Sequence, residues 1–128
     1  MFRTLALTGL TLCLALPATA FEYVAGFKDW AVYQDRVNGE TVCYATTKAS
    51  DKAPKSVTHG DVVFFVTYFR GSSQPQNSLR VAYDLREDVQ GEVSVGRESW
   101  KMYTVKKESF AHDDDERRIT SAIRKGSE

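Results

Sequence analysis

A chain of 128 residues, 42% of them hydrophobic, is the size of one domain with a small core. Its 17 basic and 17 acidic residues balance, so there is no basic surplus with which to bind nucleic acid or an anionic membrane. No zinc-ligand spacing, phosphate-binding loop or serine elbow occurs, and we assign no catalytic, cofactor or metal residue from the sequence.

The first twenty residues have the pattern of a secretory signal peptide. Arg3 supplies the positive start, residues 5–16 are apolar, and Ala18-Thr19-Ala20 provides small residues before a cleavage site. The alternative is an uncleaved anchor, but the apolar run is too short to span a bilayer comfortably. We therefore predict a signal peptide over 1–20 and a single exported domain over 21–128, with no membrane-spanning segment and a formal charge of −1 once Arg3 is lost.

The first half of this domain has strand patterns. Residues 27–33 alternate as a first strand, and 40–47 form the next one. Asn38-Gly39 between them favours a type I′ hairpin turn, because both residues accept a positive φ. Residues 48–60 are a polar loop, and the run DVVFFVTYFR over 61–70 predicts a central strand that is apolar on both faces and needs cover on both.

The second half continues the pattern and ends in a helix. Residues 78–85 alternate cleanly, 92–95 and 98–105 form a hairpin around Gly96-Arg97, and 109–111 is a short strand. Residues 113–126 predict a helix with Asp113 as its cap and Glu116 three residues on, as in a capping box. An apolar stripe runs along one face, and Gly126 follows its end. The fold class is mainly β, an immunoglobulin-like antiparallel β-sandwich with one short C-terminal helix at an edge or end.

Two groups of residues invite an enzymatic interpretation. Cys43 is the one cysteine left after cleavage, so no internal disulfide can form. The residue is interpreted in one of three ways: as a buried strand residue, as a partner in an intermolecular disulfide, or as a reactive thiol. Cys43, His59 and Asp61 together have the residue types of a catalytic triad, although a triad is recognised by its geometry and not by residue types alone. The run from His112 to Asp115 reads either as a metal site or as an acidic helix start.

Aromatic residues are too numerous for one small core, so we expect those left outside it to form an interaction patch. They include these ten: Tyr23, Phe27, Trp30, Tyr33, Tyr44, Tyr68, Phe69, Tyr83, Trp100 and Tyr103.

Four segments resemble the invasion-associated locus B family of exported bacterial proteins: FKDWAVY, GETVCYATTK, FFVTYF and RRITSAIRKGSE. The resemblance implies an immunoglobulin-like sandwich in the periplasm, at the outer membrane or secreted, with a link to host-cell invasion in some members. It also implies a second cysteine near residues 32–35, which is lacking here, and a further β segment after the Lys-Gly-Ser signature. Without that segment we expect an uncovered sheet edge or core face. The resemblance therefore implies that residues 21–128 are a C-terminally truncated product or fragment, or else a short natural variant.

We therefore expect an exported, non-enzymatic protein that binds an unidentified protein or cell-surface partner. The alternatives are a small periplasmic hydrolase or metal-dependent enzyme using Cys43, His59 or the cluster from His112 to Asp115, and an inhibitor or chaperone-like module that offers a strand edge.

Overall fold

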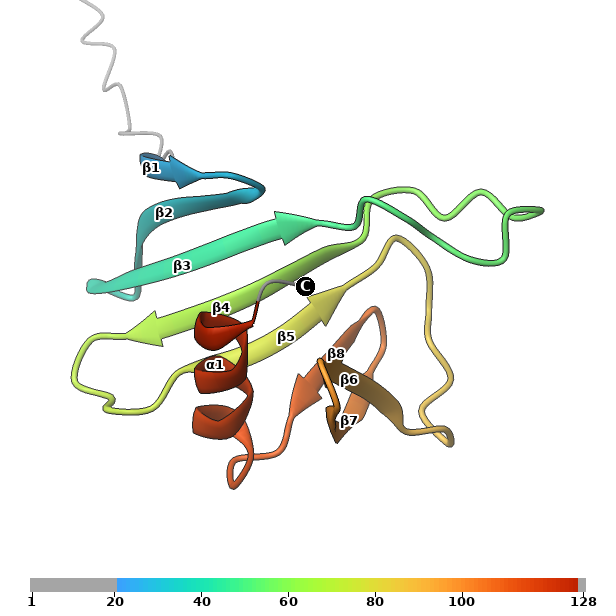
Figure 1. Cartoon of the computed structure of the whole chain (residues 1–128). Coiled ribbons are helices and arrows are strands. Elements are labelled where there is room, and N and C mark those ends of the chain that lie inside the picture. Colours follow the sequence, from blue (N-terminus) through green and yellow to red (C-terminus); the bar gives the residue numbers. More distant parts are fainter. Residues whose placement is uncertain (1–20, 127–128) are drawn as a thin grey trace, which may run out of the picture.

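The computed structural model describes residues 21–126, so the predicted signal peptide and the last two residues lie outside the described part. Within these residues it has eight strands and one helix (Figure 1). Their bounds are β1 Glu22–Phe27, β2 Trp30–Val37, β3 Glu40–Lys48, β4 Val63–Phe69, β5 Gln76–Arg80, β6 Gly91–Val95, β7 Glu98–Val105, β8 Glu108–Ala111 and α1 Glu116–Lys125.

All eight strands belong to one antiparallel sheet in the order β1-β2-β3-β4-β5-β8-β7-β6. The Asn38-Gly39 turn is confirmed, with φ of 52° and 80°, and it holds β2 and β3 in a continuous register from Trp30↔Thr47 to Val37↔Glu40. The predicted hairpin of β6 and β7 around Gly96 is also present.

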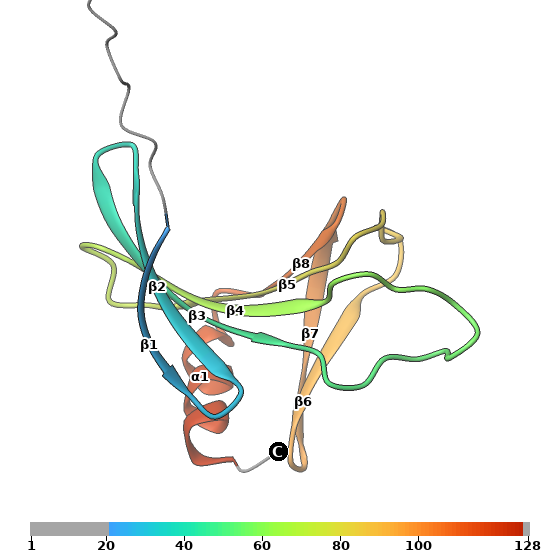
Figure 2. The ribbon, with the colours of Figure 1, turned by 90° about the horizontal axis from the view of Figure 1, so that it is seen from above.

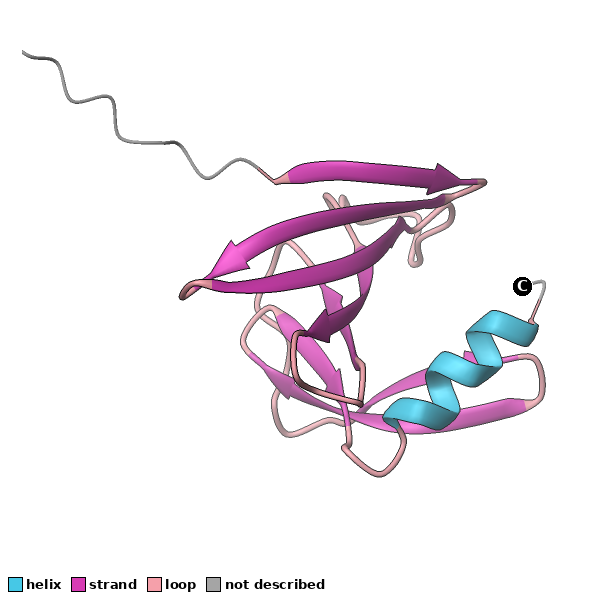
Figure 3. Cartoon of the chain, turned by 90° about the vertical axis from the view of Figure 1, so that its left-hand side faces the viewer, coloured by secondary structure: helices cyan, strands magenta, loops and turns pink. Residues whose placement is uncertain are grey.

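The sheet bends strongly between its two ends. Figures 2 and 3 show β1 and β2 on one side, β6 and β7 on the other, and α1 in the hollow between them. The mainly β, antiparallel fold with a short C-terminal helix is thus confirmed, and its sandwich-like form arises from the bending of a single sheet. The helix lies over the face of the sheet and not at an edge or end, where it contacts β5 and β6.

The core is small and lies mostly on the helix side of the sheet, with Val42, 5% exposed, buried on the other face. Ile119 of α1 is fully buried and Met102 of β7 is 2% exposed, with Val66 of β4, Val81 and Ala111 also buried nearby in the fold. Fully burying such a side chain contributes about 1.5–3 kcal/mol. This side therefore supplies most of the apolar burial that holds the helix to the sheet.

Two predicted strands have different bounds in the structure. The predicted strand 27–33 contains a turn, since Lys28 has a φ of 53° and Phe27 pairs with Trp30 across it. The predicted strand 78–85 ends at Arg80, because the chain then turns along the β7–β8 hairpin, where the Val81 N–H donates to the Lys107 carbonyl at 2.9 Å. Alternation alone could not distinguish this extended loop from a strand.

The helix is shorter than predicted and begins differently. Asp115, and not Asp113, is the residue before its first turn, and its side chain makes no capping hydrogen bond. Glu116 turns into the interior instead of back to a cap. Gly126 ends the helix in an extended conformation (φ −76°) and donates its N–H to the Ala122 carbonyl at 2.8 Å. Tertiary contacts to β5 therefore define this helix start more than local capping does.

Candidate functional site

A row of aromatic side chains crosses the sheet on the face opposite α1. Tyr23 lies across from Tyr33, and Tyr33 lies across from Tyr44, so three neighbouring strands place a tyrosine at one level. Beyond β4 the row continues through the register Phe65↔Ser78, Ser78↔Phe110 and Phe110↔Tyr103. Directly opposite residues share a face of the sheet. We call these six side chains the aromatic row: Tyr23, Tyr33, Tyr44, Phe65, Phe110 and Tyr103.

Four rings of the row contact one another in sequence from Tyr23 to Phe65, and Phe110 and Tyr103 form a separate stacked pair with centroids 5.6 Å apart. The Tyr33 and Tyr44 rings stack with centroids 5.6 Å apart and planes at 22°, and Tyr23 meets Tyr33 edge to face at 5.7 Å. The Phe65 ring centroid is 6.0 Å from that of Tyr44, and all three centroid distances fall within the range of favourable aromatic pairs. These mutual contacts reduce the conformational freedom of side chains that are otherwise only half-buried or exposed.

No element among residues 21–126 covers this face. Tyr23 is 60% exposed and Tyr103 41%, and the neighbouring Phe21, Val37, Phe69 and Val105 are exposed as well. Part of the row lines a groove of about 520 Å³ with Phe21, Asp35, Val37, Phe69 and Arg80 among its walls. Central strand β4 was expected to need cover on both faces, and here its Phe65 face remains open.

The charges of the groove are separated. Arg80 lies over the Phe65 ring, 5.2 Å from its centroid, and forms an ion pair with Glu108 at 2.6 Å. Asp35 lines the groove on β2. Burial raises the pKa of the Tyr44 hydroxyl, the carboxylate of Asp35 and the neighbouring Tyr33 add to this rise, and Arg80 opposes it.

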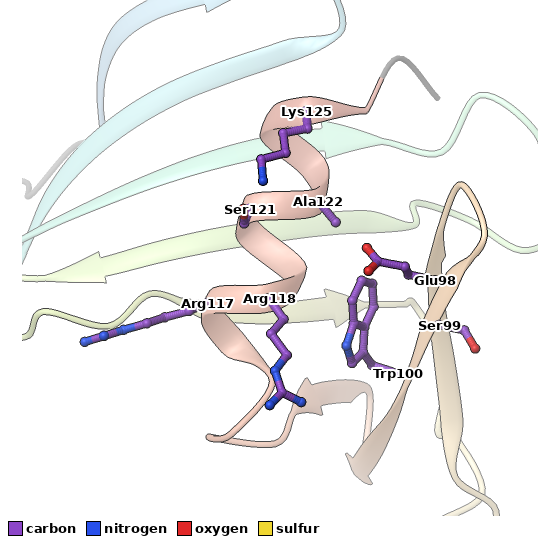
Figure 4. Close-up of a pocket in the computed structure, with 8 residues that line it drawn as sticks. All are labelled: Glu98, Ser99, Trp100, Arg117, Arg118, Ser121, Ala122 and Lys125. Carbon is purple, nitrogen blue, oxygen red and sulfur yellow. The ribbon is translucent and has the colours of Figure 1, made fainter.

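A second hollow of about 600 Å³ lies between α1 and the β6–β7 hairpin. Figure 4 shows the Trp100 ring facing Ala122 and Arg118, whereas Arg117 points away from it. The Arg118 guanidinium is 3.5 Å from Asp115, and Arg117 donates to the Ser73 hydroxyl at 3.1 Å. Because these cations diverge, the hollow does not gather positive charge at one point for an anion.

A buried polar cluster fixes α1 to β5. Asn77 is fully buried, and both its backbone N–H and its side-chain amide donate to Glu116 Oε2 at 2.6 Å. The same amide donates to Thr120 Oγ1 at 3.0 Å. Burial raises the pKa of the Glu116 carboxyl, the hydrogen bonds from Asn77 oppose this rise, and Asp113 and Asp115 add to it. The cluster aligns the helix but offers no open face to a ligand.

The structure does not bring together Cys43, His59 and Asp61, the three residues considered as a catalytic triad. Cys43 is a half-buried free thiol on β3, where it pairs with Gln34 and Tyr68. The carboxylate of Asp61 is 3.7 Å from Lys48, which lies five residues along β3 from Cys43 and so about 17 Å away. His59 Nε2 lies 2.9 Å from the Pro54 carbonyl oxygen in the loop before β4. The geometry that nucleophilic catalysis needs is therefore not formed by these three side chains.

The run from His112 to Asp115 forms a turn before α1. Its His112 ring packs 5.2 Å from the Tyr103 ring, and the Asp113 carbonyl accepts from Gln74 at 2.9 Å. Within residues 21–126 no three His, Cys, Asp or Glu side chains converge to hold a metal ion. The acidic run thus acts as a connection into the helix.

The sheet has two edges, β1 and β6. β1 is an exposed six-residue strand with an irregularity between Tyr23 and Ala25, and β6 has five residues. Short and bulged edges resist the addition of a further strand. The strand-edge alternative therefore has less support here than a contact made through the face of the sheet.

Sequence reasoning anticipated an exposed aromatic patch but not its composition. Phe65 was placed on one face of the central strand and Phe110 in a short strand, but neither was among the aromatic candidates, and Asp35 was not singled out. The spacing of Tyr33 and Asp35 could have placed Asp35 beside the aromatic patch, since residues two apart on a strand share a face. The sequence could not predict that Phe65 and Phe110 lie in line on either side of Ser78, because this alignment depends on β5 pairing with β8.

In the described part of the chain, no helix has the length and apolar character to cross a membrane. No family model, curated protein or solved structure matches the sequence or the fold.

Proposed function

We propose that this protein is an exported, non-enzymatic binding protein of the invasion-associated locus B type, which contacts a partner in the periplasm or at the cell surface through its aromatic row. The observation that carries the proposal is the series of ring contacts from Tyr23 to Phe65, with a second pair at Phe110 and Tyr103, on the sheet face opposite α1. Tyrosine and arginine dominate the residues that carry binding energy at protein interfaces. The predicted signal peptide supports the location.

The shape of the face also favours a macromolecular partner. The groove of about 520 Å³ is shallow and continues into exposed aromatic and aliphatic side chains on both sides. Exposed apolar patches rimmed by polar groups mark interaction sites in soluble proteins. A row that spans from β1 to β7 is wider than a small ligand needs.

The test uses residues 21–128 immobilised and exposed to an envelope extract, with captured species identified, purified and measured by calorimetry. We expect the double variant Tyr33→Ser, Tyr44→Ser to lose at least tenfold in affinity, since aromatic anchors often cost about 2 kcal/mol or more on truncation. Tyr83→Ser is the matched control, because Tyr83 is 42% exposed but lies in the loop after β5.

Two results would reject the proposal. One is a purified partner that binds the double variant and the wild type equally. The other is turnover of a substrate by the pure domain that is abolished by Cys43→Ala or His59→Ala. Cell fractionation tests the location separately, and retention of the full chain in the cytosol would exclude the exported role.

A further inference from the structure

Asp35 has an unusual position at one end of the groove. It is half-buried on β2 between Tyr33 and Val37 of the same face, and across from Val42, which is 5% exposed. Its Oδ1 accepts the Arg36 backbone N–H at 2.6 Å. Among residues 21–126 no lysine, arginine or histidine nitrogen forms an ion pair with it.

Two other carboxylates on this face are neutralised. Glu108 pairs with Arg80 at 2.6 Å, and Glu92 pairs with Lys101 at 2.6 Å. Glu40, across from Val37 at the end of the β2–β3 hairpin, is a second carboxylate near Asp35 and is exposed. The hairpin end of the face therefore carries unneutralised negative charge beside aromatic rings.

The opposite end of the groove holds Arg80, whose charge is neutralised by Glu108. Arg80 lies across from Val63, whereas the strand pairings from Asp35 through Val42 reach Phe69. Val63 and Phe69 are the two ends of β4, so the backbone positions of Asp35 and Arg80 are separated by about 20 Å along the strand direction. That span suits an extended polypeptide segment of roughly six residues.

We propose, building on the proposed function, that the hairpin end of the groove receives a lysine or arginine side chain of the partner polypeptide, with Asp35 as its counter-ion and Tyr33 and Tyr44 beside it. A cation near tyrosine rings is attracted by their π faces, and partial desolvation strengthens both this attraction and the ion pair. The residues of the partner that follow the cation are apolar and lie along the row towards Phe65.

The probe is a short synthetic peptide with one lysine followed by alternating leucine and serine, compared with the same peptide carrying acetyl-lysine. Binding to residues 21–128 is measured by NMR titration up to millimolar peptide. We expect the lysine peptide to bind on the order of tenfold more tightly than its acetylated form, and Asp35→Asn to remove this preference. Glu92→Gln is the matched control, since it makes the same charge change at a carboxylate already paired with Lys101.

Each outcome has a defined meaning. Equal affinity for the two peptides, no binding of the lysine peptide, or an unchanged preference in Asp35→Asn overturns the cation site. Tetramethylammonium binding as tightly as the peptide also overturns it, because the site would then take a free small cation. Loss of both peptides in Tyr33→Ser, Tyr44→Ser, with Asp35→Asn unchanged, leaves the proposed function standing and rejects only this inference.

Discussion

Replacing Asn77 with alanine tests how the helix is held to the sheet. Asn77 is fully buried on β5, and its amide donates to Glu116 Oε2, to the Glu116 carbonyl and to Thr120 Oγ1 at 2.6, 3.1 and 3.0 Å. The substitution removes these side-chain bonds and retains the backbone N–H bond to Glu116. The Glu116 carboxylate, itself 3% exposed, then loses one of its two donors.

The expected loss of unfolding free energy is large for a domain of this size. A hydrogen bond to a charged group contributes about 1.5–3 kcal/mol, and a buried group left unsatisfied adds a desolvation cost. With the small cavity left by the amide, we expect Asn77→Ala to destabilise the protein by about 3 kcal/mol. Total stabilities of small domains are about 5–15 kcal/mol, so this change is a substantial fraction.

Urea unfolding followed by tryptophan fluorescence measures the effect, because Trp100 lies beside α1 (Figure 4). Ser73→Ala is the matched control: Ser73 accepts a bond from Arg117 of the same helix, but in an exposed position, and we expect a change within about 0.5 kcal/mol. If Asn77→Ala and Ser73→Ala have the same unfolding free energy, the cluster does not hold the helix and the reasoning is refuted.

Three further predictions concern ionisation and the hairpin. Because the pKa of Glu116 is raised in the folded protein, its stabilising contribution is complete below the unfolded pKa near 4.5 and is lost as pH rises through the higher folded pKa. The unfolding free energy of Glu116→Gln should therefore increase relative to that of the wild type between pH 4 and 7 in urea titrations. A difference in unfolding free energy that does not change with pH would contradict this. Asp35→Asn should lower the pKa of Tyr44 in an ultraviolet titration, because one cause of its elevation is removed, and an unchanged pKa would show that the carboxylate is not coupled to the row. Gly39→Ala should cost about 1 kcal/mol in unfolding free energy, since Gly39 has a φ of 80°, and an unaltered urea midpoint would count against the I′ turn.

Local patterns were sufficient where neighbouring residues determine the structure. Asn38-Gly39 accepts positive φ at both positions and so specified its hairpin and the register of β2 on β3. The alternation within residues 61–70 assigned Phe65 and Val66 to opposite faces, as the structure has them. Period-two alternation is a property of the chain itself and needs no knowledge of the partner strand.

The sequence by itself thus determined an antiparallel, mainly β chain with a short terminal helix and a surplus of aromatic residues. Only the tertiary structure decided that β5 pairs with β8, which joins Phe65 to Phe110 through Ser78 and makes separate aromatics into one row. It also decided that Glu116 turns inward to Asn77, 39 residues away, instead of capping its own helix. Both outcomes depend on long-range contacts, whose energy comes from side chains that meet only after the chain has folded.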